Sequence, residues 1–315
     1  MKEINLREYY PFYNMDVYLE VSDEIAGQLD RFKLDEEAHR VRVLRAKAYF
    51  SLNRGDGIEK DALQKPPQPL ELILKAGGKV EAVVAKDADE FFGVNSRVQL
   101  AEAAKIMKHR INRKHMESGV TLVDPENTYI GSDVKIGDVA SMDTVILPGC
   151  VLEGNTEIGE DCEIGPNSRL TDTKLGNGVK FQTSTAIESE IGNETTVGPF
   201  AYIRPNCHIG NRVKVGDFVE VKNSTIGDGT KIPHLSYVGD TDAGEKINFG
   251  CGSIMVNYDG KKKHRTTIED NVFVGCNVNL VAPVTVKKGS YIAAGSTITK
   301  DVPEDVLAVA RARQQ

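Results

Sequence analysis

Several residue types and patterns are scarce in this sequence. It has no tryptophan, and none of its apolar runs approaches the ~18 residues needed to span a bilayer. The first thirty residues lack the apolar segment of a secretory signal. The five cysteines are odd in number and form no Cys-x-x-Cys pair, which disfavours a structural zinc site and a disulfide framework. We therefore expect free thiols, no metal site and a cytoplasmic protein that does not bind membranes.

Acidic residues outnumber basic ones, 46 against 39, and the net charge is −7. A protein that binds nucleic acid over its whole surface is normally basic, so nucleic acid is not an expected partner. The hydrophobic content of 40% and the charged content of 27% are ordinary for a globular protein. A chain of 315 residues can form two domains, or one solenoid with an appendage.

The first region, residues 1–66, is expected to be a helical segment of unknown role. Ser22 is followed by acidic residues and is typical of a helix N-cap. A charged pattern with apolar interruptions then predicts a helix from Ile25 to about Leu52. The proline-rich run at 65–69 predicts a domain boundary.

The second region, residues 67–118, is expected to connect this segment to the rest of the chain. It begins with a predicted short helix, Leu70–Ala76, and an extended stretch, Lys79–Ala85. A long helix is predicted from about Ser96 to Met116. Its apolar positions fall roughly on one helical face, which suits packing against the next domain; they are Val98, Ala101, Ile106 and Ile111.

The third region, residues 119–315, has a different period. Aliphatic residues recur every six positions in three runs: Ile146, Leu152, Ile158, Ile164 and Leu170; Ile191, Val197, Ile203, Ile209, Val215 and Val221; Ile268, Val274, Leu280, Val286, Ile292 and Ile298. Neither a helix nor an alternating strand produces this period, whereas a parallel β-helix does. The fold class is therefore expected to be mostly β: a left-handed parallel β-helix preceded by a helical connector and a short, mostly helical N-terminal segment.

In such a fold each hexad supplies a short strand and a corner. The aliphatic side chains stack from coil to coil in one continuous core. Glycine follows many of the aliphatics, as at Gly159 and Gly216, and we expect glycine or asparagine near a corner to adopt backbone angles that branched residues cannot. A β-sandwich would need sustained alternation and hairpin turns, and neither is found. The ten-residue step from Ile136 to Ile146 predicts that residues near 139–142 bulge from a corner.

The largest interruption of the hexads is residues 254–267. It holds three consecutive lysines followed by His264 and Arg265. A cationic loop that leaves a solenoid has no role in the core, and it favours binding a phosphate or another anion. The alternative is a solvated surface excursion.

His234 lies between the hexad aliphatics Ile232 and Val238, so its side chain need not point into the core. Histidine is the natural general base near neutral pH, although a single histidine is more often structural or simply exposed. Arg204 and Lys222 are 18 residues apart, about one coil, which predicts that one lies above the other. With Tyr237 and Asn248, they could share one face with His234.

Residues 70–315 resemble the carboxy-terminal part of the bifunctional N-acetylglucosamine-1-phosphate uridylyltransferase/glucosamine-1-phosphate acetyltransferase (GlmU) family. The matching motifs run in family order over about 245 residues. They are Gly93-Val94-Asn95, Asp124-Pro125, Val151-Leu152-Glu153-Gly154-Asn155-Thr156, Ile203-Arg204-Pro205, the segment around His234, Val256-Asn257-Tyr258-Asp259-Gly260, Leu280-Val281-Ala282-Pro283-Val284, Ile292-Ala293-Ala294-Gly295-Ser296 and Leu307-Ala308-Val309-Ala310-Arg311.

The resemblance implies N-acetylation of glucosamine-1-phosphate by acetyl-CoA in a homotrimer whose sites lie between neighbouring subunits. His234 is similar to the family's proton acceptor. The positions that match the sugar-phosphate side are Arg204, Lys222, Tyr237, Asn248 and Lys263. The positions that match the acetyl-CoA side are Cys251, Asn257, Tyr258, Cys276, Ala294 and Arg311. The family uses direct attack on the thioester, so the two cysteines are interpreted as packing residues and not as acyl carriers.

The chain also departs from the family. Only the tail of the family's nucleotidyltransferase domain is similar, at about residues 70–95, so residues 67–118 are expected to be a remnant of that domain plus a connector helix. The sequence has no glycine-rich loop of that domain, and Asn95, which resembles a magnesium-contacting residue, lacks its aspartate partner. The resemblance therefore implies that uridylyl transfer and its magnesium site are lost. His264 stands where the family usually has an aromatic residue.

Residues 1–60 do not resemble this family and are instead similar to small sigma-factor-like open reading frames. This leaves a second hypothesis, a non-catalytic trimeric hexapeptide-repeat protein with a regulatory N-terminal segment. A metal-dependent hydratase on a β-helix would need three convergent histidines, whereas only His208 and His234 lie in the clear hexads and His264 lies on the loop. Hexapeptide acetyltransferases for serine or other sugars remain competitors.

Overall fold

A computed structural model describes residues 2–5, 16, 18–31, 87–137 and 143–312. The chain divides into two compact units, Met1–Asp87 and Ala88–Gln315. In the first unit β1 (Lys2–Asn5) pairs with β2 (Tyr18–Val21) in antiparallel fashion. Residues 23–31 follow as a helix, so the expected helix is described only in part. The predicted boundary at 65–69 and the elements predicted between 70 and 85 lie outside the described residues.

The expected N-cap at Ser22 is confirmed, because its Oγ accepts the amide hydrogen of Ile25 at 3.3 Å. The second unit begins with the 3₁₀ turn η2 (Ala88–Phe91) and helix α4 (Arg97–Glu117). Ser96 caps α4 by accepting the amide hydrogen of Gln99 at 3.2 Å. The long helix was therefore predicted within one residue at each end.

The predicted apolar face of α4 was only partly right. Ile111 packs against the core that follows, but Val98 is 63% exposed. The buried side chains of α4 are instead Asn112 and His115. Asn112 donates from Nδ2 to the carbonyl of Thr128 at 3.0 Å, so this contact with the first coil is polar.

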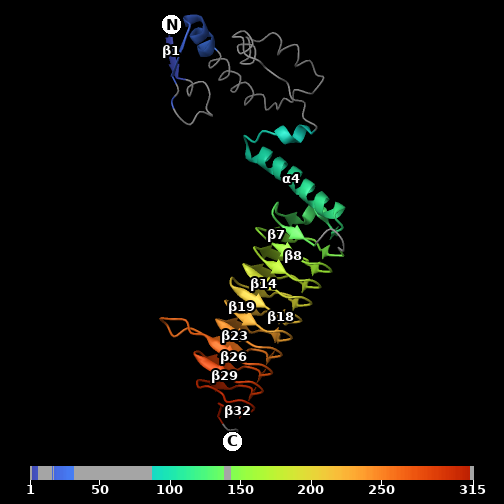
Figure 1. The fold of residues 1–315 in the computed structure, drawn as a ribbon, viewed down its shortest axis with the longest axis vertical. Coiled ribbons are helices and arrows are strands. Elements are labelled where there is room, and N and C mark those ends of the chain that lie inside the picture. The colour runs from blue at the N-terminus through green and yellow to red at the C-terminus, as the bar shows by residue number, and fades with distance from the viewer. Residues whose placement is uncertain (1, 6–15, 17, 32–86, 138–142, 313–315) are drawn as a thin grey trace. The chain divides into compact units, whose positions relative to one another are not determined.

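The rest of the second unit is a prism of three parallel sheets stacked along one axis (Figure 1). The 11-stranded sheet, called the first face here, contains β3 (Thr121–Leu122), β6 (Val145–Ile146), β9 (Glu163–Ile164), β12 (Lys180–Phe181), β15 (Thr196–Val197), β18 (Lys214–Asp217), β21 (Lys231–His234), β24 (Asn248–Phe249), β27 (Phe273–Val274), β30 (Tyr291–Ile292) and β32 (Leu307–Ala308).

The 10-stranded second face contains β4 (Tyr129–Ile130), β7 (Val151–Glu153), β10 (Arg169–Thr171), β13 (Thr185–Ile187), β16 (Tyr202–Ile203), β19 (Glu220–Lys222), β22 (Tyr237–Gly239), β25 (Ile254–Val256), β28 (Asn279–Val281) and β31 (Thr297–Ile298). The 9-stranded third face contains β5 (Lys135–Ile136), β8 (Glu157–Ile158), β11 (Lys174–Leu175), β14 (Ser189–Ile191), β17 (Cys207–Ile209), β20 (Thr225–Ile226), β23 (Thr241–Ala243), β26 (Thr266–Ile268) and β29 (Val284–Val286). A 3₁₀ turn, η3 (Pro125–Asn127), precedes β4.

The hexad aliphatics form the core, as predicted. Leu152 pairs with Leu170, and Ile203 pairs with Val221, each on the next coil of the second face. These four side chains have 0% exposure. Successive hexads fall on successive faces, which is the arrangement expected of a left-handed parallel β-helix with six-residue repeats. The predicted fold class is confirmed.

The role expected for the glycines was partly wrong. Gly165 and Gly198 do adopt positive φ, at 111° and 103°. Gly159 and Gly216 do not adopt positive φ. Glycine is required at these two positions because the neighbouring coil lies too close to leave room for a side chain. A Cβ on Gly216 would lie 1.9 Å from the carbonyl oxygen of Pro233. Asparagine holds several of the positive-φ corner positions, as expected, and aspartate holds others.

The two irregular stretches of the solenoid leave the register of the coils intact. Ile136 pairs with Ile158 and Ile146 with Ile164, while the predicted bulge at 139–142 lies outside the described residues. Residues 257–265, called the arm here, leave the prism between β25 and β26 and project from it (Figure 1).

Candidate acyl-transfer site

His234 ends β21, at the corner where the first face turns into the second. The next residue, Leu235, has a φ of 44° and makes the turn. Ser236 donates from Oγ to the His234 carbonyl at 2.8 Å, which fixes the backbone of the corner. The His234 side chain is 54% exposed, so it points out of the core, as the hexad position predicted.

Asp217 lies one coil before His234 and pairs with it in register. The His234 Nδ1 atom is 2.6 Å from Asp217 Oδ1. This contact is the largest cause of a lowered pKa for the Asp217 carboxyl. The imidazole ring is therefore held by Asp217 through Nδ1, and Nε2 is the ring nitrogen that remains available to a ligand.

Several residues expected on the acetyl-CoA side continue along the same corner. The register of β21 with β24 places Cys251 one coil beyond His234, and that of β24 with β27 places Cys276 one coil further. Ala294 follows on the next coil and Arg311 after it. Cys251 is half-buried, whereas the last three are exposed. We call Cys251, Cys276 and Ala294 the corner column.

Arg204 and Lys222 stack on the second face, as their spacing predicted, because Ile203 pairs with Val221. Arg204 donates from Nη1 to Glu220 Oε1 at 2.8 Å, and this contact raises the pKa of Arg204. The Lys263 ammonium from the arm lies against Lys222. This contact is the largest cause of a lowered pKa for Lys222, and partial burial of Lys222 is the next largest.

Tyr237 begins β22 on the second face and interacts with the charges of Arg204 and Lys263. Its hydroxyl accepts a hydrogen bond from Asn257 Nδ2 at 3.2 Å. The same Nδ2 atom is 2.6 Å from Asp240 Oδ2, inside the prism corner. The structure thus connects a residue expected on the sugar side with one expected on the acetyl-CoA side.

The arm has its own internal bonds. Tyr258, which is 58% exposed, and Lys263 form an antiparallel bridge. Asp259 accepts from the amides of Lys261 and Lys262 and contacts His264 at 2.7 Å, and these bonds lower the pKa of Asp259 to about 2. The cationic sequence is therefore a closed hairpin with defined geometry.

Arg265 anchors the base of the arm. Its guanidinium contacts both oxygens of Asp242, at 2.6 and 2.5 Å, and donates to the carbonyl of Asn223 at 3.0 Å. The Asp242 contact raises the pKa of Arg265 and lowers that of Asp242. Because Arg265 is engaged in this way, it holds the arm and is not a free cation for a ligand.

Asn248 does not join the other sugar-side residues within one chain. It lies on the first face, paired with Lys231 and Phe273, whereas Arg204 and Tyr237 lie on the second face. The expectation that all of these residues share one face with His234 was therefore wrong, because His234 and Asn248 lie on the first face and the others on the second. Each hexad carries the chain onto a new face. A ligand that contacts both faces must sit at an edge or between copies of the prism.

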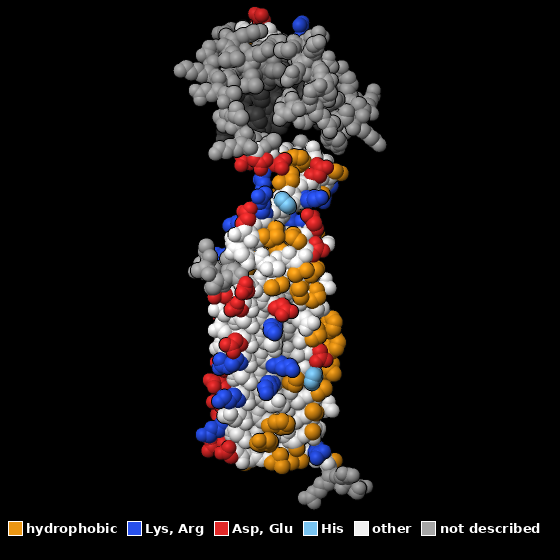
Figure 2. Space-filling model, turned by 90° about the vertical axis from the view of Figure 1, so that its right-hand side faces the viewer, with side chains coloured by type: hydrophobic (Ala, Val, Ile, Leu, Met, Phe, Trp, Pro, Cys, Tyr) orange, Lys and Arg blue, Asp and Glu red, His pale blue; other side chains and the backbone are white. Residues whose placement is uncertain are grey.

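Sequence reasoning missed Asp217 and Asp240. Asp217 could have been found from its 17-residue offset to His234, which is close to one coil. Asp240 occupies a corner with a φ of 51°, and its 17-residue offset to Asn257 is the same kind of signal. Figure 2 shows rows of basic and acidic side chains on one side of the prism, with hydrophobic side chains gathered along an edge.

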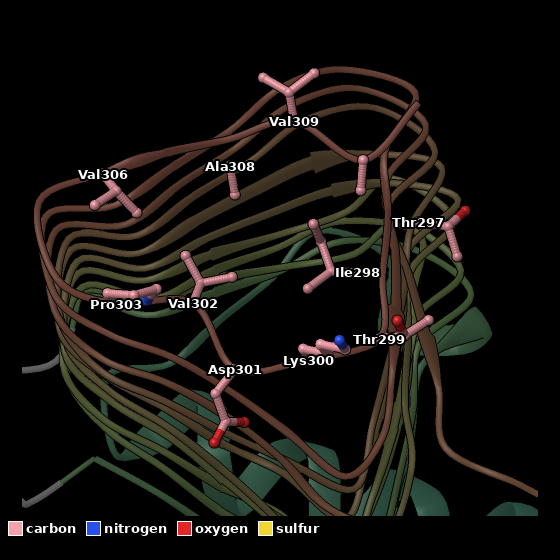
Figure 3. A pocket seen from close by; sticks show the side chains of 11 residues that line it. Thr297, Ile298, Thr299, Lys300, Asp301, Val302, Pro303, Val306, Ala308 and Val309 are labelled. Carbon is pink, nitrogen blue, oxygen red and sulfur yellow. The ribbon is translucent and has the colours of Figure 1, made fainter. Parts of the chain in front are cut away.

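Two hollows on the described part of the prism surface do not coincide with this site. One of about 470 Å³ lies at the carboxy-terminal end of the prism, where Ile298, Val302 and Ala308 point into the last coils (Figure 3). The other, of about 670 Å³, is a shallow depression on the third face beside Glu190 and His208. Neither includes His234.

Within the part of the chain that the structure describes, no helix combines the length and the hydrophobicity that a membrane span requires. No group of three or more His, Cys, Asp or Glu side chains in the described ranges is placed to hold a metal ion.

Comparison with known proteins supports the six-residue repeats found in the sequence. A family model described as bacterial transferase hexapeptide (six repeats) matches residues 142–172, 188–223 and 265–300. The bifunctional protein GlmU of Geobacillus sp. (strain WCH70) is 58% identical over 245 residues, which are 78% of this chain and 52% of that protein. The bifunctional protein GlmU of Caldanaerobacter subterraneus subsp. tengcongensis is 60% identical over 245 residues, with the same coverage of 78% and 52%.

Over most of its length the chain is thus similar to part of GlmU, and it carries hexapeptide repeats. The resemblance recognised in the sequence is thereby confirmed, and the GlmU-like chain spans about half the length of the curated relatives it matches. Among solved structures, the UDP-N-acetylglucosamine acyltransferase from Campylobacter jejuni is 18% identical, with a TM-score of 0.40, over 56% of this chain and 67% of that chain. This likeness is too slight to indicate an activity.

Proposed function

We propose that the chain transfers the acetyl group of acetyl-CoA to the amine of glucosamine-1-phosphate. The observation that carries the proposal is a cation cluster: Arg204 and Lys222 on the second face, with Lys263 of the arm against Lys222. The second face begins at the corner that carries His234. Two ammonium groups in contact repel each other, as the lowered pKa of Lys222 reflects. A bound phosphate would relieve this repulsion, so the cluster favours an anionic ligand.

In this proposal His234 is the general base. The amine nitrogen attacks the thioester carbonyl carbon, the carbon–sulfur bond breaks, and CoA leaves as its thiolate. His234 Nε2 accepts the proton that the amine loses, and this proton can then pass to the leaving sulfur. Phosphate binding by the cation cluster would hold the amine in place for attack.

The acetyl-CoA side is proposed to lie along the corner column, with Arg311 at its far end. In this proposal, backbone amides along the corner stabilise the oxyanion that forms on the thioester. Because Cys251 and Cys276 lie beyond His234 along this line, we interpret them as walls of the binding site. Asn257 and Tyr258 would contact the same ligand from the arm.

We further propose a cytoplasmic homotrimer. Asn248 and the cation cluster lie on different faces, and a neighbouring prism can bring the two faces together. As in the GlmU resemblance, the product would enter UDP-N-acetylglucosamine and cell-wall precursor synthesis. Uridylyl transfer and its magnesium site are proposed to be lost, because the sequence lacks the glycine-rich loop that this chemistry uses.

The proposal is tested by thiol release from acetyl-CoA by the full chain. Glucosamine-1-phosphate should support turnover, whereas glucosamine without phosphate should support it at least about tenfold less, since one charged contact is worth about 1.5–3 kcal/mol. Equal rates with both acceptors would remove the role of the cation cluster. No thiol release with any amino sugar, in a chain that forms trimers, would favour the non-catalytic hypothesis.

A further inference from the structure

Asp240 is a charged side chain inside the corner that follows β22, with only 6% of its surface exposed. Both of its carboxylate oxygens are occupied by amide groups. Asn257 Nδ2 lies 2.6 Å from Oδ2, and Asn223 Nδ2 lies 2.5 Å from Oδ1. Lys222, Lys263 and Arg265 each interact favourably with its charge. A buried carboxylate held in this way has a defined position.

The carboxylate fixes the orientation of the Asn257 amide. An ionised carboxyl group only accepts hydrogen bonds, so Asn257 must turn its NH₂ group towards Asp240 and its Oδ1 away. The NH₂ group has two hydrogens. One goes to Asp240, and the other goes to the Tyr237 hydroxyl at 3.2 Å.

The orientation continues to Tyr237. A hydroxyl group that accepts a hydrogen bond from Asn257 still has one hydrogen of its own to donate. That hydrogen cannot point at the NH₂ group, so it must be offered elsewhere. Tyr237 interacts with the charges of Arg204 and Lys263, which places its hydroxyl where an anion would bind.

Gly239 supplies an independent observation on the same arrangement. A Cβ at this position would lie 2.3 Å from the Tyr237 hydroxyl oxygen and 2.8 Å from Asn257 Nδ2. The strand therefore leaves room for these two side chains to meet over it. The close approach of the hydroxyl and the amide is built into the backbone of β22.

We propose that Asp240 is a positioning residue that sets the direction of hydrogen bonding in the chain Asp240–Asn257–Tyr237. It makes the Tyr237 hydroxyl a donor to an oxygen of the sugar phosphate. It also leaves Asn257 Oδ1 as an acceptor for an N–H group of a ligand. This inference rests on the proposed function for the identity of the phosphate, but the direction of the hydrogen bonds follows from the residues themselves.

The test is an exchange of the two interacting groups. Asp240→Asn alone and Asn257→Asp alone should each lower the melting temperature, because each leaves two donors or two acceptors facing each other. The double variant D240N/N257D restores one donor and one acceptor, and should recover most of the loss. In it, however, the carboxylate at position 257 accepts from Tyr237, so the hydroxyl hydrogen now points inward.

Tyr237→Phe then reports the direction of the hydroxyl. In the wild-type chain it should weaken glucosamine-1-phosphate binding, measured by calorimetry, about tenfold, which corresponds to about 1.4 kcal/mol. In the D240N/N257D background it should change the Kd less than about twofold, because the hydroxyl no longer donates to the ligand. Comparing the two backgrounds separates this effect from any repulsion by the new charge.

Two outcomes would overturn the proposal. A tenfold effect of Tyr237→Phe in both backgrounds would show that Asp240 does not set the direction. A double variant no more stable than the single ones would show that the two groups are not paired. A wild-type chain that does not bind glucosamine-1-phosphate would instead refute the proposed function, while the melting temperatures still test the pairing.

Discussion

Asp217 and His234 occupy equivalent places on successive coils, and their side chains meet with 2.6 Å between Asp217 Oδ1 and His234 Nδ1. A carboxylate that accepts from Nδ1–H holds the neutral imidazole in the tautomer whose Nε2 is free to accept a proton. The Asp217 side chain is 38% exposed and the His234 side chain 54%. The pair is therefore open to a ligand.

Asp217→Asn should lower kcat by about ten- to a hundredfold, since general-base catalysis contributes roughly 10²–10⁴ and only its orientation is lost. The KM for acetyl-CoA should change little, because Asp217 does not lie on the corner column. Steady-state kinetics measures both. Glu190→Gln is a matched control: Glu190 contacts His208 Nδ1 at 3.2 Å on the third face, and its loss should leave kcat unchanged. An equal fall in both variants would contradict the assignment.

Protonation of Asp259 should loosen the arm in acid. Its pKa is lowered from 3.8 to about 2, so its stabilising contribution is present above about pH 4 and is lost as the pH falls through about 2. Hydrogen exchange of the Lys262 amide, which donates to Asp259, should therefore accelerate between these values beyond the intrinsic trend. In Asp259→Asn the arm should show no such transition. An unchanged profile in the variant would show that another group controls the arm.

Gly216→Ala should destabilise the prism beneath the proposed base. The added Cβ would lie 1.9 Å from the Pro233 carbonyl oxygen, on the coil that carries His234. We expect a loss of about 1–3 kcal/mol, typical of overpacking, measured by denaturant unfolding. Gly131→Ala is the control, because its nearest atom would be 3.4 Å away and it should be nearly neutral. Similar losses in both variants would contradict the close-approach explanation.

The five cysteines should divide into two classes. Cys150, Cys162 and Cys207 are buried in the core, and burial raises the pKa of each thiol. Cys251 is half-buried and Cys276 exposed. Alkylation of the native chain followed by mass spectrometry should therefore modify the last two and spare the core three. Acetyl-CoA should slow the modification if the corner column binds it, and labelling of a core cysteine in folded protein would contradict the packing.

The solenoid could be predicted because its core repeats. Leu152 and Leu170 are required to be aliphatic by their place in the stack, and a six-residue period has no other common structural source. The exact role of the glycines could not be predicted, because the close approach of Gly216 to Pro233 depends on the distance between coils. The six-residue period shows which residues stack on one another, but it does not give the distance between neighbouring coils.

The candidate site was harder to predict. The stacking of Arg204 and Lys222 followed from their spacing, since one coil separates them on the same face. Asn248 was misplaced because assigning a face requires the phase of every hexad and not only the number of residues between positions. Asp217 and Asp240 were missed because their partners, His234 and Asn257, are reached through coil stacking, which is not visible in local sequence.

The account depends most on His234 as the group that takes the proton during acyl transfer. The most direct measurement is thiol release from acetyl-CoA with glucosamine-1-phosphate as acceptor, comparing the full chain with His234→Ala. Circular dichroism and oligomer size should be unchanged, because the side chain is 54% exposed and its hydrogen bond within the described residues is to the half-exposed Asp217. The account predicts a rate at least about a hundredfold lower in the variant. Turnover near that of the wild-type chain would contradict it.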